Sequence, residues 1–380
     1  MPALPRYTAL ISGLFLLSFV IAPLAKAFET EAREAILLDH ETGSVLFEKQ
    51  ADKAMPPASM SKIMTAYMVF GRLEEGRLSM NDTLPVSEKA WRKGGSKMFV
   101  EVGEEVAVRD LLRGVIVQSG NDACIVLAEG ISGSEEAFAR EMTEVGREIG
   151  LQNSTFANAT GWPHPDHRMS ARDLATLASH IIEEYPQYYE IYSETEFTWN
   201  DIRQGNRNPL LYRNIGADGL KTGHTEEAGY GLTASAVQDG RRLIMVVTGL
   251  DSVNQRAEEA SRLLSWGFRE FENFNLAEKD EPIDEAAVWL GAEATVPLVA
   301  EDELVVTLPH AARDELEARI VYEGPVPAPI EKGQMIGTLI LSAPGMPEQE
   351  IPLLAAKDVD KAGLFGRLFA AGKYLVLGNP

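Results

Sequence analysis

A serine and a lysine stand three residues apart near the start of the chain, directly after a double proline. The segment Ser59-Met60-Ser61-Lys62 follows Pro56-Pro57, where a helical pattern of apolar residues begins. Residues three apart share a helix face, so the Ser59 hydroxyl and the Lys62 amine can approach each other. Serine needs a base to act as a nucleophile, and a lysine desolvated among other cations can supply one. The pair predicts acyl transfer at Ser59.

Alone this motif is weak evidence, since a chain of this length contains about one Ser-x-x-Lys match by chance. The alternative interpretation is a capped helix with a solvated lysine. Ser-x-Asn occurs at Ser79, Ser119 and Ser252. The Ser79 copy looks like a polar surface turn, whereas Ser119-Gly120-Asn121 separates two apolar helical stretches and predicts a buried junction. Lys221-Thr222-Gly223 occurs once, on a predicted strand where glycine would let a substrate backbone lie close. In this order the three motifs are typical of the penicillin-recognising acyltransferases, here with Ser-Gly-Asn in the middle.

The elements that must hold these motifs indicate an α+β domain, an antiparallel sheet flanked by helices. Strands are predicted at both ends of residues 28–277: a strand-turn-strand over 35–48, and a hairpin of 230–237 and 243–250 with Asp239-Gly240 at its tip. Helices are predicted between and after them, from near Ser59 and over 108–117, 122–131, 135–149, 171–184 and 255–271. Residues 278–360 change to short strand-like runs punctuated by Pro and Gly, which predicts a small all-β sandwich without a catalytic grouping.

Both chain ends differ from this globular part. Residues 1–27 predict an export signal, with Arg6 before an apolar run and Ala25-Lys26-Ala27 as the cleavage site; an uncleaved membrane anchor is the alternative. Residues 361–380 hold Lys361, Arg367 and Lys373, no acid, and apolar residues at helical spacing. This pattern predicts a cationic amphipathic tail lying on the inner-membrane surface, rather than a helix packed on the last domain.

Composition excludes several other function classes. The 380 residues carry 35 Lys+Arg against 57 Asp+Glu, a formal net charge of -22, which would repel a phosphate backbone and argues against nucleic-acid binding. A single cysteine, Cys124, allows neither an internal disulfide nor a multi-thiolate zinc cage, and it is expected to be a small apolar helix residue rather than a nucleophile. The six histidines lack metal-ligand spacing, so neither a metal nor another cofactor is expected.

The motifs and their flanking residues resemble one family closely: the serine D-alanyl-D-alanine carboxypeptidases, low-molecular-mass penicillin-binding proteins of the bacterial envelope. The resemblance covers essentially the whole chain, from the export signal to the tail. It implies a β-lactamase/transpeptidase-like catalytic domain. The matching stretches are Pro57-Ala58-Ser59-Met60-Ser61-Lys62, Ser119-Gly120-Asn121-Asp122-Ala123-Cys124, Ser170-Ala171-Arg172-Asp173, Lys221-Thr222-Gly223-His224-Thr225, Ala228-Gly229-Tyr230 and Trp266-Gly267-Phe268-Arg269.

The resemblance also implies a mechanism. Ser59 would attack the carbonyl between the two terminal D-alanines of a peptidoglycan stem peptide, with Lys62 as the base for acylation. Ser119 and Asn121 would relay protons and bind the substrate amide, and Lys221 would hold the proton network and the charge in place. Water would then hydrolyse the acyl-enzyme. β-Lactam antibiotics would acylate the same serine, on the periplasmic face of the inner membrane.

The substrate-binding residues implied by the resemblance are Lys221, Thr222, Gly223, His224 and Arg256. The backbone N–H groups of Ser59 and His224 would form the oxyanion hole, so His224 would act through its backbone rather than as a base. Arg256 would hold the free C-terminal carboxylate of the substrate, which a guanidinium fork suits. One stretch departs from the pattern: some relatives carry His-Gly-Leu where this chain has Thr160-Gly161-Trp162.

Three rival functions stay open. A class A-type β-lactamase shares the motif set, but its Glu-x-x-Leu-Asn motif is missing between Asn121 and Lys221. A D,D-endopeptidase would cut cross-links, whose scissile bond lacks the same free terminus, and would not depend on Arg256. A catalytically silent, membrane-tethered envelope scaffold would have no use for the intact Ser59 and Lys62.

Overall fold

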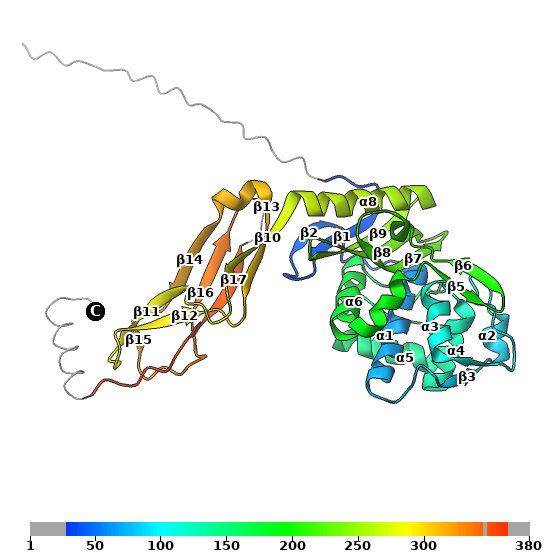
Figure 1. Ribbon diagram of the computed structural model, residues 1–380, viewed down its shortest axis with the longest axis horizontal. Helices are drawn as coiled ribbons and strands as arrows, with labels where there is room; N and C mark the ends of the chain where they lie inside the picture. The colour runs from blue at the N-terminus through cyan, green and yellow to red at the C-terminus, as the bar shows by residue number, and fades with distance from the viewer. Residues whose placement is uncertain (1–27, 345–347, 364–380) are drawn as a thin grey trace, which may run out of the picture.

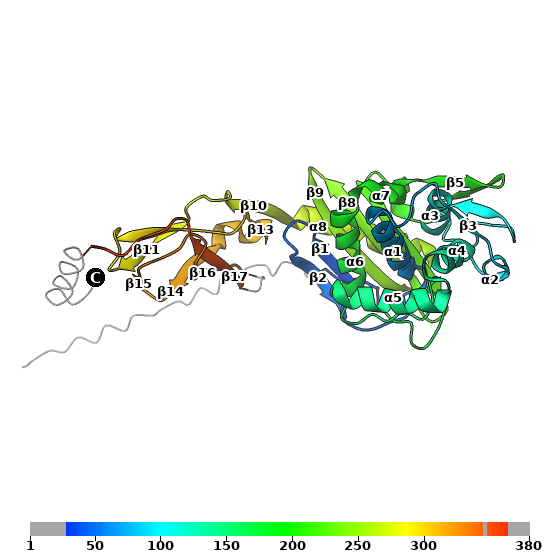
Figure 2. The ribbon, with the colours of Figure 1, turned by 90° about the horizontal axis from the view of Figure 1, so that it is seen from below.

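The computed structural model describes residues 28–344 and 348–363, and the fold is that of two modules lying end to end (Figures 1 and 2). The predicted signal peptide over 1–27 lies outside the described residues. So does the predicted tail, apart from residues 361–363. No helix within the described residues is long and apolar enough to cross a membrane.

The first module is built on a five-stranded antiparallel sheet in the order β2-β1-β9-β8-β7. The predicted strand-turn-strand and hairpin are both confirmed, and they pair with each other through β1 and β9. The strand with the Lys-Thr-Gly motif, β7, lies at the edge of this sheet. The strands are β1 (Glu34–Asp39), β2 (Val45–Lys49), β7 (Ala217–Thr225), β8 (Gly229–Gln238) and β9 (Arg241–Leu250).

The helices agree closely with those predicted from apolar periodicity. Serine side chains cap several of them; Ser170, for example, accepts a hydrogen bond from the Asp173 N–H and starts α6. The Ser-Ala-Arg-Asp stretch is therefore a helix cap. The helices are α1 (Lys62–Glu74), α2 (Glu88–Arg92), α3 (Val108–Ile116), α4 (Asn121–Ser132), α5 (Glu135–Glu148), α6 (Ala171–Glu184), α7 (Pro186–Tyr189) and α8 (Val253–Glu270).

Alternate strand residues enter two separate cores on the two faces of the sheet. Ile36, Ile244 and Val246 pack with the main helix cluster, whereas their neighbours Leu37 and Met245 pack with α8. Figure 1 shows α8 above the sheet and the other large helices below it. The predicted α+β class, with an antiparallel sheet flanked by helices, is confirmed.

The second module is all-β, as predicted, with its own apolar core. Its sheets have the orders β14-β16-β17-β12-β11-β15 and β10-β13. Residues 271–277 form β10, which pairs with β13, so the pairing of this module begins before the predicted boundary at 278. Its strands are β10 (Phe271–Ala277), β11 (Asp284–Trp289), β12 (Thr295–Val299), β13 (Leu304–Pro309), β14 (Glu317–Tyr322), β15 (Val326–Pro327), β16 (Met335–Ser342) and β17 (Gln349–Ala355).

Two small two-stranded antiparallel sheets of the first module are absent from the sequence prediction. One pairs β3 (Thr83–Pro85) with β4 (Glu105–Ala107) across the segment that holds α2, and the other is a hairpin of β5 (Glu196–Trp199) and β6 (Ile202–Gly205). The strands of the second are only four residues long, so the alternation of half-buried Phe197 and Trp199 with exposed residues in β5 gives little signal in the sequence. This hairpin matters for the site because Gln204 Nε2 donates to the Lys97 carbonyl, close to Ser96 and Gly95.

Candidate active site

Ser59 lies in a 3-10 turn (Ala58–Ser61) directly before α1, rather than in the first α-helical turn that its spacing from Lys62 suggested. The Lys62 Nζ donates to Ser59 Oγ at 2.8 Å and to the Thr160 carbonyl at 2.6 Å. Ala58 has a φ of 50°, an unfavourable value for a residue with a Cβ, and such backbone outliers concentrate at functional sites. The serine and its candidate base are thus in direct contact.

Lys62 is almost completely buried, with 1% of its surface exposed. Burial, joined by the charges of Arg207 and Lys93, lowers the Lys62 pKa from 10.5 to about 8. The carboxylate of Asp122 opposes this shift but does not cancel it. A substantial fraction of Lys62 is therefore neutral near pH 7 to 8, as a general base requires.

Ser119 and Asn121 occupy the predicted buried junction, between α3 and α4. Ser119 has a φ of 61°, and its Oγ is buried without a hydrogen-bond partner among the described residues. A buried hydroxyl without a hydrogen-bond partner lowers the stability of the fold. The Ser119 hydroxyl is thus free to form a hydrogen bond with a substrate or with solvent. Asn121 Nδ2 donates to the Gly94 carbonyl at 2.8 Å, which holds its amide beside the loop before Ser96.

Lys221 and Thr222 are buried on the edge strand β7. Burial and the charges of Lys62, Arg207 and Arg256 hold the pKa of Lys221 well below its usual value. Gly223 meets a second requirement besides the expected approach of a substrate backbone: a Cβ there would lie 2.9 Å from the Pro57 carbonyl oxygen. Glycine thus lets β7 contact the turn that carries Ser59, rather than only a substrate backbone.

His224 and Arg256 meet on one aromatic ring. The His224 imidazole stacks on Tyr230 with centroids 3.9 Å apart, and the Arg256 guanidinium lies 5.8 Å from the same ring centroid. Burial lowers the pKa of Arg256 to about 10, and its Nε has no hydrogen-bond partner among the described residues. A buried guanidinium with a free donor can bind a carboxylate.

Two residues of this region were not predicted as site residues from the sequence. Arg207 lowers the pKa values of Lys62, Lys221 and Arg256, and donates to Ser96 Oγ at 2.5 Å. Tyr230 joins His224 to Arg256. Its strand was predicted, and it is part of a family stretch, but only the strand pairing of His224 with Tyr230 indicates its position. Arg207 has no local sequence signal.

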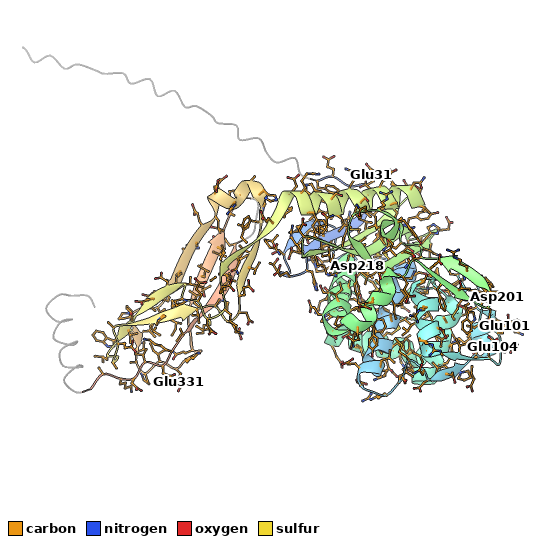
Figure 3. All side chains as sticks on the ribbon, in the orientation of Figure 1. Glu31, Glu101, Glu104, Asp201, Asp218 and Glu331 are labelled. Carbon is orange, nitrogen blue, oxygen red and sulfur yellow. The ribbon has the colours of Figure 1, made fainter. Side chains whose placement is uncertain are left out.

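The site is cationic in an acidic protein. Within the described residues, neither Lys62, Lys221 nor Arg256 forms an ion pair with a carboxylate. Many acids lie on the outer surface instead, such as Glu101 and Asp201 at the far end of the first module (Figure 3). The free positive charge favours a substrate with a carboxylate.

Other reactive groups near the site do not join it. Cys124 is buried in α4 as predicted, and burial raises its thiol pKa to about 12, which keeps it protonated and unreactive. Across residues 28–344 and 348–363, no group of three or more His, Cys, Asp and Glu side chains could hold a metal ion. The chemistry of the described site is that of serine, amines and backbone amides.

Comparison with known proteins gives the family. The family model for D-alanyl-D-alanine carboxypeptidases (peptidase S11) matches residues 21–252, and that for the C-terminal domain of penicillin-binding protein 5 matches residues 271–361. The chain is 40% identical over 382 residues to D-alanyl-D-alanine carboxypeptidase DacC of Escherichia coli, covering 96% of both chains.

Solved structures agree with this. Penicillin-binding protein 5 from Haemophilus influenzae superposes with a TM-score of 0.81 and 38% identity, covering 88% of this chain and 98% of that one. Penicillin-binding protein D2 from Listeria monocytogenes in its ampicillin-bound form has a TM-score of 0.58 and 30% identity, covering 63% of this chain and 98% of that one. The chain therefore belongs to the peptidase S11 family of D-alanyl-D-alanine carboxypeptidases, as its motifs predicted.

Proposed function

We propose that this carboxypeptidase removes the terminal D-alanine of peptidoglycan stem peptides through an acyl-enzyme on Ser59. The observation that carries the proposal is the 2.8 Å contact between Ser59 Oγ and Lys62 Nζ, in a setting that lowers the pKa of Lys62 to about 8. Neutral Lys62 takes the hydroxyl proton as Ser59 Oγ bonds to the scissile carbonyl carbon. The N–H groups of Ser59 and His224 stabilise the oxyanion.

The tetrahedral intermediate then collapses and D-alanine leaves with a proton. Ser119 and Asn121 bracket the substrate amide, and the unpaired Ser119 hydroxyl supports a part in relaying the proton from Lys62 to the leaving nitrogen. Lys221, whose pKa is lowered in part by Lys62, would hold the same proton network in place. Water hydrolyses the ester in the second half-reaction and regenerates Ser59.

Arg256 gives the reaction its exopeptidase character in this proposal, because its buried guanidinium binds the free carboxylate of the terminal D-alanine. Arg256→Ala is expected to lower kcat/KM for a D-alanyl-D-alanine tripeptide by about 10- to 100-fold, the cost of one charge-assisted contact. Arg262→Ala is the matched control, since Arg262 is on the same helix, is 55% exposed and pairs with Glu259. An unchanged kcat/KM in Arg256→Ala, with cross-linked peptides still cut, would favour an endopeptidase.

The direct test measures D-alanine release from that tripeptide, together with the mass of the protein quenched with excess ampicillin. The wild type should release D-alanine and carry one ampicillin adduct on the peptide that contains Ser59, and Ser59→Ala should do neither. Absence of an adduct on that peptide contradicts the mechanism. Long-lived acyl-enzymes with β-lactams are expected, so rapid turnover of a chromogenic cephalosporin would point to a β-lactamase.

The same proposal puts the enzyme on the periplasmic face of the inner membrane, exported by residues 1–27 and held by the cationic tail over 361–380. Deleting 361–380 should release the protein into the soluble fraction with its D-alanine release unchanged. A truncated protein that stays with the membrane after signal cleavage contradicts the tail assignment.

A further inference from the structure

The loop over residues 157–168 lies against the catalytic turn and contacts Lys62. Its Thr160 carbonyl accepts a hydrogen bond from Lys62 Nζ at 2.6 Å, and Ser59 Oγ lies 2.8 Å from the same nitrogen. A neutral amine has a single lone pair, so a fixed carbonyl that takes one N–H helps to decide where that lone pair points. The position of the Thr160 carbonyl therefore bears on how Lys62 meets Ser59.

The tip of this loop is a rigid unit held by Asn158. The backbone N–H groups of Thr160 and Trp162 donate to Asn158 Oδ1 at 3.1 and 3.0 Å, and Asn158 Nδ2 donates to the Trp162 carbonyl at 3.0 Å. Because these hydrogen bonds hold residues 158–162 together, the position of the loop tip depends on the contacts between the loop and the rest of the molecule.

One attachment is a buried hydrogen bond to the catalytic turn itself. Ser61 Oγ and His167 Nε2 are 2.8 Å apart, and the two residues are 0% and 2% exposed. The Ala157 N–H donates to His167 Nδ1 at 3.3 Å, so Nδ1 is unprotonated and Nε2–H is assigned as the donor to Ser61. Burial lowers the pKa of His167 to about 3, which keeps this arrangement neutral in the working pH range.

Direct packing joins the same two segments. Gly161 has a φ of 74°, and a Cβ there would lie 1.8 Å from the Ala58 carbonyl oxygen and 3.2 Å from Ser61 Cβ. No side chain fits between the loop and the turn at this point. A shift of either segment is therefore passed to the other, and through Thr160 to Lys62.

We propose that Ser61 and His167 are positioning residues for acylation: their hydrogen bond fixes the 157–168 loop on the catalytic turn, and so keeps the Thr160 carbonyl where it orients Lys62. This inference rests on the proposed role of Lys62 as the base. It assigns a positioning role to Ser61, the second serine of the motif, through its hydrogen bond with His167, which is 106 residues further along the chain.

The test compares variants of His167 that keep different ring functions. Gln can restore a donor near Nε2, whereas Asn can restore an acceptor near Nδ1 and Leu restores neither. The second-order rate of acylation by a fluorescent penicillin should stay within about threefold of wild type in His167→Gln, and fall about tenfold or more in His167→Asn and His167→Leu, the cost of about one hydrogen bond. Ser61→Ala should fall like His167→Leu, and the double variant no further.

In a purely structural role the acylation rates would follow the stabilities of the variants, so melting temperatures measured in parallel separate the two effects. Equal rates in His167→Gln and His167→Asn, or losses that multiply in the double variant, overturn the inference. Wild-type rates in all variants overturn it too, whereas failure of the wild type to acylate at Ser59 would overturn the proposed function instead.

Discussion

The burial of Lys62 should set the pH at which Ser59 is acylated. With a pKa of about 8 in place of 10.5, the neutral fraction of Lys62 at pH 7 rises from about one in 3,000 to about one in ten. The gain is roughly 300-fold, or about 3 kcal/mol in the availability of the base. Acylation should therefore rise about tenfold per pH unit below pH 8 and level off above about 9.

The substitution Arg207→Gln tests whether the surroundings of Lys62 set the pH dependence of acylation. It removes a positive charge that lowers the pKa of Lys62, so the acid limb of the curve of acylation rate against pH should move to higher pH. Arg203→Gln is the matched control, because Arg203 is 70% exposed and pairs with Glu196. The assay is the second-order rate of acylation by a fluorescent penicillin from pH 5.5 to 10.5. Because Lys62 also lowers the pKa of Lys221, the apparent midpoint belongs to the coupled pair.

Three results would refute this reasoning. One is a rate that does not change between pH 6 and 9, and another is a midpoint near the ordinary lysine value of 10.5. The third is an equal shift of the limb in Arg207→Gln and Arg203→Gln, which would mean that the charge next to the site has no special effect on Lys62.

Three further outcomes are expected. Lys62→Met should be inactive but melt at a higher temperature than wild type at pH 7; this difference should narrow as the pH rises from about 8 to 10.5, because protonation of the unfolded lysine is lost there. Asp122→Ala should lower the unfolding free energy by about 2–4 kcal/mol in urea, since its buried carboxylate accepts the Met98 and Phe99 N–H groups; an effect below 1 kcal/mol contradicts this. Gly223→Ala should slow acylation far more than Gly231→Ala, because its Cβ meets the Pro57 backbone oxygen, whereas that of Gly231 meets the movable tip of Met60; equal rates contradict it.

Much of the fold follows from local pattern. The helices over 121–132, 135–148 and 171–184 were predicted within a residue or two, because their apolar period is clear and Ser134, Ser170 and Gly133 mark ends. The β5–β6 hairpin and β10 were missed. The strands of the hairpin are only four residues long, and β10 continues the chain directly from α8, so neither carries a clear local signal.

The residues of the site divide in the same way. Ser59 and Lys62 could be paired from sequence because three residues along a helical turn fix their separation, and Ser119 and Lys221 could be named because they belong to short motifs. Local spacing says nothing about burial, which is a property of the whole packed chain. The lowered pKa of Lys62 was only a condition of the hypothesis until the tertiary structure surrounded the amine with cations and apolar residues.

Contacts between distant segments were beyond the sequence altogether. Arg207 beside Lys62, Gly223 against Pro57, and His167 on Ser61 each join residues far apart along the chain. The sequence alone determined which chemistry was available: a serine, amines and amide donors in a recognised order. Tertiary structure decided the protonation of the base and the orientation of its lone pair, because both depend on solvent exclusion and on angstrom-scale distances that only folding creates.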